Sequence, residues 1–275
     1  AQTPVEKSLL WEISGNGLAK KSYLYGTFHV NEKISYHLPD DIYTHLLNAD
    51  IVSNESNPET WNSIFDLLYN SMARTLKDSK NPFDLEPITQ KQMIQLFNTR
   101  NFLKEMSSVN NGPKSDYEEN TVLDMFIFQT AKKHGKKIVG LEDAKKSVIN
   151  LIQTTRAELE KQMKAMEDGG TTVEARRNAL NKLLKGRTEE EALKDFYRDK
   201  DIVMLDSLSK LSASPGNHKA LIIDRNYIMT RSIDSLARQG SLFSAVGAAH
   251  LAGKEGILQL LRNKGYTVNP VNSTT

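Results

Sequence analysis

A glycine followed three residues later by a histidine occurs twice in the sequence, each time after an apolar run. The two copies are Gly26-Thr27-Phe28-His29 and Gly247-Ala248-Ala249-His250. Glycine lets the chain turn sharply, so the histidine can point back over the end of the preceding strand. A single copy of this pattern is common by chance, and a lone histidine is more often structural than functional. Two copies in matching positions make His29 and His250 candidates for one shared site.

Two glutamates follow apolar runs in a similar way. Glu55 and Glu142 each stand one or two residues after a predicted buried strand. The carboxyl ends of parallel strands meet at one crevice of an open sheet, and ligands bind there. We therefore expect His29, Glu55, Glu142 and His250 to face a common site. In the alternative interpretation, each carboxylate satisfies backbone N–H groups at the start of a helix.

The types of these four side chains favour metal chemistry. The sequence contains no cysteine, which leaves His, Asp and Glu as metal-ligating side chains. Two neutral imidazoles with one or two carboxylates suit Mn²⁺, Co²⁺, Fe²⁺ or Zn²⁺. Such an ion can lower the pKa of a bound water to about 7 and polarise a carbonyl group, while a spare carboxylate acts as a general base.

A third candidate cluster lies within an apolar helical pattern near residue 225. Arg225 and Asn226 are polar residues in the run from Ile222 to Met229. The arginine can bind a substrate carboxylate or stabilise an oxyanion. It can equally form an ion pair with Asp224 or with a nearby glutamate. The sequence leaves both interpretations open.

The elements that carry these residues alternate between short apolar runs and amphipathic helices. This alternation predicts an α/β fold with a mixed, largely parallel central sheet flanked by helices. The turn Gly15-Asn16-Gly17 predicts that the first two strands form an antiparallel hairpin. Helices are expected to fill much of 57–134, with an N-cap at Asn57. The predicted strands cover residues 9–13, 22–26, 49–53, 136–141, 242–247 and 266–268.

The segment from about 145 to 212 is charged and has a high helix propensity. Residues Thr188 to Glu191 have the spacing of a capping box. We expect this segment to be a helical insertion that covers the sheet or acts as a lid. Its basic residues alternate with acidic ones, as on a solvated helix face, which argues against a nucleic-acid partner. We expect residues 1–275 to form a single domain of two halves, each with one Gly-x-x-His strand end.

Composition excludes several classes of protein. The 275 residues are 39% hydrophobic and carry 36 Lys and Arg against 34 Asp and Glu, a formal net charge of +2. This near balance gives no reason to expect a nucleic-acid partner. No apolar run approaches the roughly 18 residues of a membrane-spanning helix. The first residue, Ala1, and the absence of cysteine lead us to expect an extracytoplasmic protein, periplasmic or secreted, after removal of a signal peptide.

An ordered set of motifs resembles the TraB/PrgY/GumN family, to which the Tiki proteins belong, over about residues 9–269. By this resemblance His29, His250 and Glu55 form a metal-dependent active centre. Glu142 and the pair Arg225-Asn226 match further signature positions. The motifs are Tyr-Leu-Tyr-Gly-Thr-Phe-His-Val at 23–30, Ser-Asn-Glu at 53–55, Gly-Leu-Glu-Asp at 140–143, Asp-Arg-Asn-Tyr-Ile-Met at 224–229 and Val-Gly-Ala-Ala-His-Leu at 246–251.

The resemblance implies a fold near the erythromycin esterase and ChaN-like proteins. Tiki members are described as metal-dependent proteases that favour Mn²⁺ or Co²⁺. We therefore expect a metal-dependent hydrolase, a peptidase acting on peptide or protein substrates, with Zn²⁺ or iron as other possible metals. Glu142 is then a candidate base or fourth ligand, and Arg225 orients the substrate or stabilises the oxyanion. The alternatives are a non-catalytic peptide- or haem-binding protein and a metal-free esterase-like hydrolase in which His29 activates water.

Overall fold

A six-stranded sheet forms the centre of the protein. The computed structural model describes residues 7–28, 33–36, 38, 40–60, 122–147, 149–150, 153–154, 157 and 171–271. The histidine of the first Gly-x-x-His pattern, His29, lies outside these residues, as does most of the region predicted to be helical between 61 and 121. The strands are β1 (Leu10–Gly15), β2 (Ser22–Thr27), β3 (Ile51–Asn54), β4 (Lys137–Gly140), β5 (Leu242–Gly247) and β6 (Tyr266–Pro270).

The strands lie in the order β4-β3-β5-β2-β1-β6. The four strands from β4 to β2 are mutually parallel, whereas β1 is antiparallel to both β2 and β6. The carboxyl ends of β2, β3, β4 and β5 therefore lie at the same edge of the sheet. This topology confirms the predicted mixed, largely parallel sheet with an antiparallel first hairpin.

The connection between β1 and β2 shows why the hairpin could be predicted. Gly15, Asn16 and Gly17 have φ angles of 76°, 47° and 78°. Glycine and asparagine tolerate this left-handed conformation better than other residues do. The amide of Leu18 then donates to the carbonyl of Gly15 over 3.0 Å. The turn places β2 beside β1 with Leu10 opposite Tyr25.

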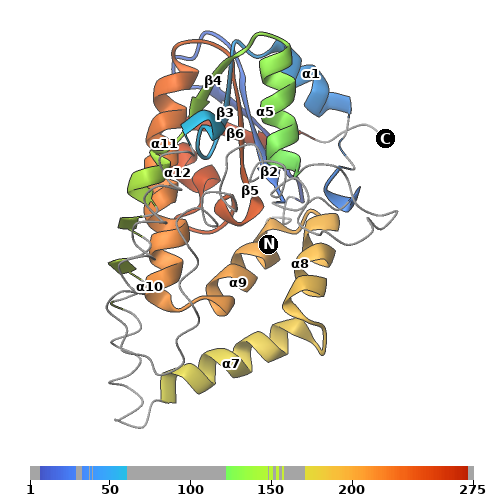
Figure 1. Cartoon of the computed structure of the whole chain (residues 1–275), viewed down its shortest axis with the longest axis vertical. Helices are drawn as coiled ribbons and strands as arrows, with labels where there is room; N and C mark the ends of the chain where they lie inside the picture. Colours follow the sequence, from blue (N-terminus) through green and yellow to red (C-terminus); the bar gives the residue numbers. More distant parts are fainter. Residues whose placement is uncertain are drawn as a thin grey trace, which may run out of the picture.

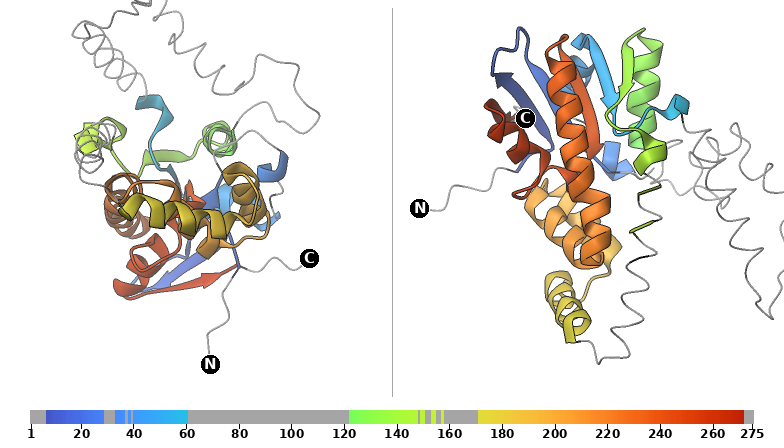
Figure 2. Two further views of the ribbon diagram at one scale, coloured as in Figure 1. Left: turned by 90° about the horizontal axis from the view of Figure 1, so that it is seen from below. Right: turned by 90° about the vertical axis from the view of Figure 1, so that its left-hand side faces the viewer.

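Helices cover both faces of the sheet (Figures 1 and 2). The helices α1 (Asp40–Asn48) and α5 (Leu123–Lys133) lie on one face, where the rings of Tyr43 and Phe126 meet edge to face at 6.3 Å. The helices α11 (Asp224–Ala237) and α12 (Ile257–Asn263) cover the other face. Because apolar side chains line both faces, the central strand β5 is buried along its whole length.

The core of the sheet is apolar apart from a few paired hydroxyl groups. Trp11, Leu24 and Phe243 are among the largest fully buried side chains. Ser53 on β3 and Ser244 on β5 are also fully buried, and their hydroxyl oxygens lie 2.8 Å apart, so each polar group has a partner. This hydrogen bond links the two strands that carry the candidate site.

The segment predicted to cover the sheet contains α7 (Thr171–Leu184), α8 (Glu189–Arg198) and α9 (Ile202–Ser212). Figure 1 places these helices beyond the carboxyl edge of the sheet, and α9 packs against the short helix η4 (Ala248–His250). The capping box at Thr188 and Glu191 is present as predicted. Tyr197 on α8 donates to the carbonyl of Gly26 over 3.1 Å, which ties α8 to the end of β2. Closure of this segment as a lid stays a prediction.

Other sequence features of the described part agree with expectation. Asn57 accepts a hydrogen bond from the amide of Glu59 at the start of the short helix η2 (Pro58–Thr60), as an N-cap does. Another short helix, η1 (Lys33–Tyr36), precedes α1.

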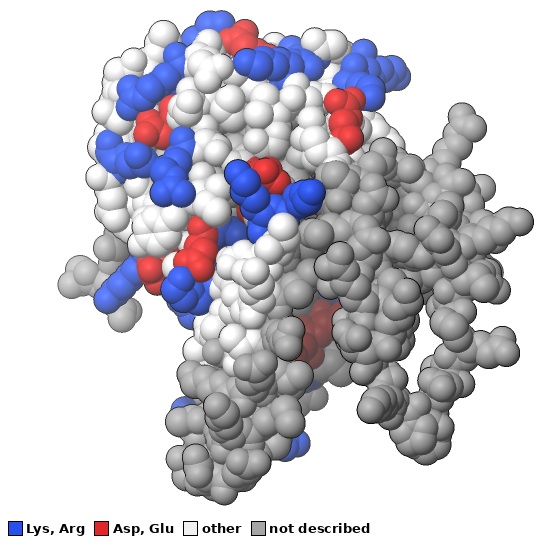
Figure 3. Space-filling model, turned by 60° about the vertical axis from the view of Figure 1, so that its left-hand side comes forward, with Lys and Arg blue, Asp and Glu red and all other residues white. Residues whose placement is uncertain are grey.

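A search of the described residues finds no helix long and apolar enough to cross a lipid bilayer. On the face shown in Figure 3, acidic and basic side chains of the described part are interspersed.

Candidate functional site

The carboxyl edge of the sheet brings together three of the four predicted strand-end residues. Glu55 directly follows β3, Glu142 comes two residues after β4, and His250 ends η4, which follows β5. Arg225, the second residue of α11, lies among them. His29, the fourth predicted residue, lies outside the described residues.

Arg225 is the centre of this cluster. Its Nε donates to both oxygens of Glu142, over 2.9 Å and 3.1 Å, and its Nη2 donates to Glu142 Oε1 over 2.6 Å. Nη2 also donates to Glu55 Oε2. The fork of the guanidinium thus bridges two carboxylates, a geometry that lysine could not provide. Of the two ion pairs that the sequence left open, Arg225 forms the one with glutamates, while Asp224 pairs with Lys219 instead.

The charges in this cluster are largely shielded from water. The exposed fraction of the side chain is 20% for Arg225, 13% for Glu55 and 3% for Glu142. Burial by itself lowers the pKa of Arg225, but the carboxylates of Glu55 and Glu142 together raise it more, and the net pKa lies above the usual range. Arg225 therefore stays a cation, and each carboxylate depends on it for a counter-charge.

A hydrogen-bonded chain fixes the ring of His250. The side-chain nitrogen of Asn226 donates to the carbonyl of Glu255 over 2.8 Å, so the amide oxygen of Asn226 faces the histidine. That oxygen lies 2.6 Å from Nδ1 of His250. An amide oxygen can only accept a hydrogen bond, so Nδ1 carries the hydrogen and Nε2 of the neutral ring keeps its lone pair. Nε2 lies 3.5 Å from Oε1 of Glu55 and 3.5 Å from Nη1 of Arg225.

Backbone contacts hold Glu55 and Glu142 side by side. The amide of Gly247 donates to Glu55 Oε1 over 2.7 Å, and the amide of Glu142 donates to the carbonyl of Glu55 over 2.9 Å. The segments after β3 and β4 approach so closely that a Cβ atom on Gly140 would lie 2.6 Å from the backbone nitrogen of Asn57. Only glycine fits at residue 140 without moving the backbone that carries both glutamates.

A π-helical turn precedes Arg225, a feature that the sequence analysis missed. The short helix α10 (Pro215–His218), the π turn η3 (Lys219–Ile223) and α11 follow one another without a break. Nη1 of Arg225 donates to the carbonyl of Leu221 in this turn over 3.2 Å. Wide turns of this kind are frequent at functional sites because they change which way the following residues face. The apolar helical pattern near residue 225 predicted a helix here but contained no signal for the wider turn.

Two serines also support the cluster, and neither was predicted. Ser147 donates to Glu142 Oε2 over 2.8 Å. Ser232 on α11 donates to the carbonyl of Leu141, the residue before Glu142, over 2.5 Å. Both hydroxyls restrict the position of Glu142. Single serines in charged or helical segments are too common for the sequence to single them out.

The donors of His250 and Glu55 fit a divalent transition metal. Their facing atoms, Nε2 and Oε1, are 3.5 Å apart. This is close to the separation of about 3.4 Å between neighbouring ligands of a tetrahedral ion with bonds of about 2.1 Å. A histidine whose other ring nitrogen is hydrogen-bonded is the usual form of a metal ligand. Within the described ranges, no group of three or more His, Asp and Glu side chains is placed to hold a metal.

Comparison with known proteins identifies a family for nearly the whole chain. Residues 9–270 match the sequence profile of the TraB/PrgY/gumN family. A search of curated proteins finds no match to the chain. The matched range includes every residue of the cluster around Arg225.

Proposed function

The chain belongs to the TraB/PrgY/gumN family, and from this premise and the cluster around Arg225 we propose that it is a metal-dependent hydrolase, a peptidase acting on peptide or protein substrates. One observation carries the proposal. Nε2 of His250 faces the carboxylate of Glu55 at 3.5 Å, and Asn226 accepts the hydrogen of Nδ1, so the lone pair of the neutral ring lies on Nε2. A buried imidazole fixed in this way can act as a metal ligand or as a base.

In this proposal His250 and Glu55 hold the metal together with His29. The bound ion would polarise the scissile carbonyl and lower the pKa of a bound water. By the resemblance to Tiki proteins the metal is Mn²⁺ or Co²⁺, and the donor set also accepts Zn²⁺ or iron. The proposal also includes a fold like that of the erythromycin esterase and ChaN-like proteins. It further includes an extracytoplasmic location.

The residues around the metal ligands have separate tasks. Asn226 keeps the proton of His250 on Nδ1. Arg225 supplies a permanent positive charge beside Nε2, where it can orient a substrate carbonyl or stabilise an oxyanion. Glu142, almost fully buried, accepts three hydrogen bonds from Arg225, so we assign it the task of holding the guanidinium. The roles expected from the sequence, general base or fourth metal ligand, would require Arg225 to move away from Glu142.

A second candidate function is favoured by the position of Arg225. Its guanidinium already places a positive charge between Glu55 and Glu142, where it can stabilise a developing negative charge without a metal. The protein would then be a metal-free, esterase-like hydrolase in which a histidine activates water and Arg225 stabilises the developing charge.

The first experiment measures bound metal and turnover on the same preparations. The protein is loaded with Mn²⁺, Co²⁺ or Zn²⁺ and dialysed, and its metal content is measured by mass spectrometry. We expect near-stoichiometric metal in the unmodified protein and in His134→Ala, an exposed histidine at the end of α5. Metal should be lost in His29→Ala and in His250→Ala. Cleavage of a peptide library should exceed one product per protein and stop with a chelator.

Other outcomes separate the alternatives. Ester cleavage that a chelator leaves unchanged, with no specific metal, would favour the metal-free hydrolase. Peptide or haem binding without turnover would make the chain a binding protein and overturn both hydrolase proposals.

The role of Asn226 has its own test. Asn226→Ala removes the acceptor that fixes the His250 ring, and metal affinity should fall 10- to 100-fold. Asn226→Asp keeps an acceptor at the same place and should restore most of the affinity. Equal affinities in all three proteins would contradict the assignment of Asn226 as a positioning residue.

A further inference from the structure

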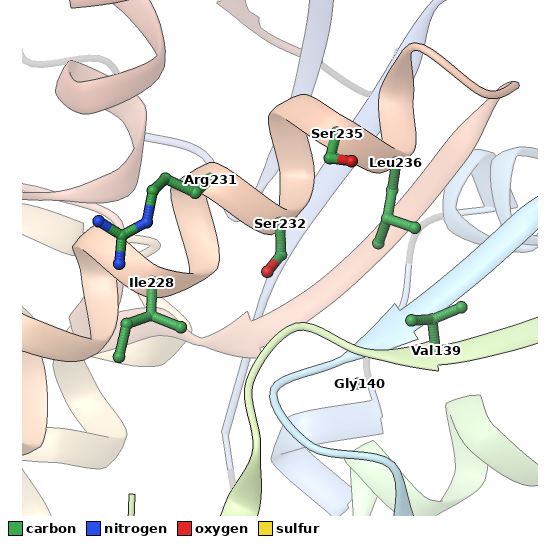
Figure 4. A pocket seen from close by; sticks show the side chains of 7 residues that line it. All are labelled: Val139, Gly140, Ile228, Arg231, Ser232, Ser235 and Leu236. Carbon is green, nitrogen blue, oxygen red and sulfur yellow. The ribbon is translucent and has the colours of Figure 1, made fainter. Parts of the chain in front are cut away.

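An open pocket of about 320 Å³ lies between α11 and the edge strand β4. Its size is in the range of sites that bind small ligands or side chains. Figure 4 shows the side chains of α11 on one side and the end of β4 on the other. The pocket is lined by Val139, Gly140, Ile228, Arg231, Ser232, Ser235 and Leu236.

The pocket has apolar walls because alternate residues of β4 face opposite sides of the sheet. Ile138 packs against Val122, Met125 and Phe128 on the α5 side, whereas Val139 faces α11. In the described part of the chain β4 pairs only with β3, so the pocket lies at a free edge of the sheet. The wall formed by α11 includes Ile228, which is 37% exposed.

Arg231 is the charged group among the residues that line the pocket. Arg231 is exposed and makes no ion pair or hydrogen bond with any residue that the structure describes. The other arginines of α11 are paired, Arg225 with Glu55 and Glu142 and Arg238 with Asp234. In Figure 4 the guanidinium of Arg231 lies beside Ile228, and the hydroxyl of Ser232 points toward the segment after β4. Within the described part of the chain, the pocket thus combines an apolar wall with a cation that has no acidic partner.

The pocket adjoins the segment that carries Glu142, because Gly140 and Ser232 both line it. Ser232 donates to the carbonyl of Leu141, and the next residue is Glu142. On α11, Arg225 and Arg231 are six residues apart, which is about 9 Å along the helix axis and about 120° around it. An extended peptide advances about 3.3 Å per residue, so at least three residues are needed to span this separation.

We propose that this pocket is a substrate subsite that binds a carboxylate three or more residues from the bond that is cleaved, with Arg231 as the residue that determines this specificity. The carboxylate is an acidic side chain or the free carboxyl terminus of a peptide. Val139, Ile228 and Leu236 provide the apolar surface for the carbon atoms next to it. The proposal rests on the proposed peptidase function, because it names the chemistry of that enzyme's substrate.

The experiment uses rhodamine-labelled pentapeptides of alanine and leucine in which one position at a time carries Glu, Gln or Lys. Each peptide is made with a free carboxyl terminus and with a carboxamide. Both cleavage and binding are measured, the second by fluorescence anisotropy. We expect Glu to be preferred over Gln about 5-fold at one position, the size of effect typical of a partly exposed charge pair. A preference for the free terminus over the carboxamide would identify the other source of carboxylate.

Variants of Arg231 complete the experiment. Arg231→Gln should abolish the preference and Arg231→Glu should reverse it toward Lys. Lys182→Glu, at an exposed residue of α7 away from the sheet, makes the same change of charge and should keep the preference. Equal preferences in the unmodified protein and Arg231→Glu, or the same reversal in Lys182→Glu, would overturn the subsite. If binding shows the preference but no peptide is cleaved, the subsite stands and the peptidase proposal fails.

Discussion

Removal of Arg225 should destabilise the protein strongly. Arg225→Met has a similar length but no charge, so it removes the guanidinium that lies between the buried carboxylates of Glu55 and Glu142. Their side chains are 13% and 3% exposed, so water can solvate them only in part. Breaking a buried charge cluster by removing one partner costs about 3–5 kcal/mol. We expect the free energy of unfolding to fall by that amount.

The assay is urea unfolding at pH 7 in the presence of a chelator, so that no metal ion replaces the guanidinium. With an m value of about 3 kcal/mol/M, the midpoint should fall by roughly 1–1.7 M. Lys219→Met is the matched control, because it removes the ion pair with Asp224, whose partners are 63% and 37% exposed. Such a surface pair contributes about 0–1 kcal/mol.

A double variant tests whether the loss comes from the unpaired carboxylates. In Arg225→Met with Glu142→Gln, one of the two buried charges is gone, and part of the stability should return. A loss below about 1 kcal/mol in Arg225→Met, equal to that of the control, would refute the reasoning. The same conclusion would follow if the double variant were less stable than Arg225→Met alone.

Three further predictions concern the framework of the site. Gly140→Ala forces a Cβ atom into the backbone of the segment after β3 and should cost about 1–3 kcal/mol in urea unfolding, with loss of any activity of the site. Tyr197→Phe leaves the hydroxyl of Tyr25 and a carbonyl at the end of β2 without their hydrogen bonds and should cost about 1–2 kcal/mol, measured in the same way. The hydrogen bond from Tyr266 and the nearby cations lower the pKa of Asp234 to about 2. The ionised Asp234 therefore contributes about 1 kcal/mol to the free energy of unfolding above pH 4, and this contribution is lost as the pH falls toward 2. Unfolding of Asp234→Asn at pH 7 and pH 2.5 checks this, and a difference from the unmodified protein that does not shrink at pH 2.5 would contradict it.

The part of the site that could be predicted from the sequence is the part that depends on strand ends. Glu55, Glu142 and His250 follow three parallel neighbouring strands, and the topology alone brings such residues together. The apolar runs and the turn at Gly15-Asn16-Gly17 were sufficient to predict those strands and the first hairpin. Local signals such as the capping box at Thr188 were equally reliable, because both partners lie within four residues.

The part that could not be predicted depends on distant contacts. From the sequence, Arg225 could either bind a substrate or form an ion pair. Its partners Glu55 and Glu142 are determined by the packing of α11 against the ends of β3 and β4. The orientation of the His250 ring depends on Asn226, whose amide is oriented by the backbone carbonyl of Glu255. A pattern of side chains does not indicate where a backbone carbonyl will lie, so the sequence could not predict this contact. The role of His29 stays a prediction, because this residue lies outside the described part of the chain.

The strand order also determines when the site can exist during synthesis. In the sheet β5 lies between β3 and β2. These two strands are therefore joined into one sheet only after residues 242–247 have left the ribosome. Glu55 is then joined to a residue 170 positions later in the chain, Arg225. Contacts of such long range form late in folding. A nascent chain that stops before β5 contains Glu55, Glu142 and Arg225 but lacks His250 and the strand that aligns them, so the proposed activity requires a chain that extends past His250.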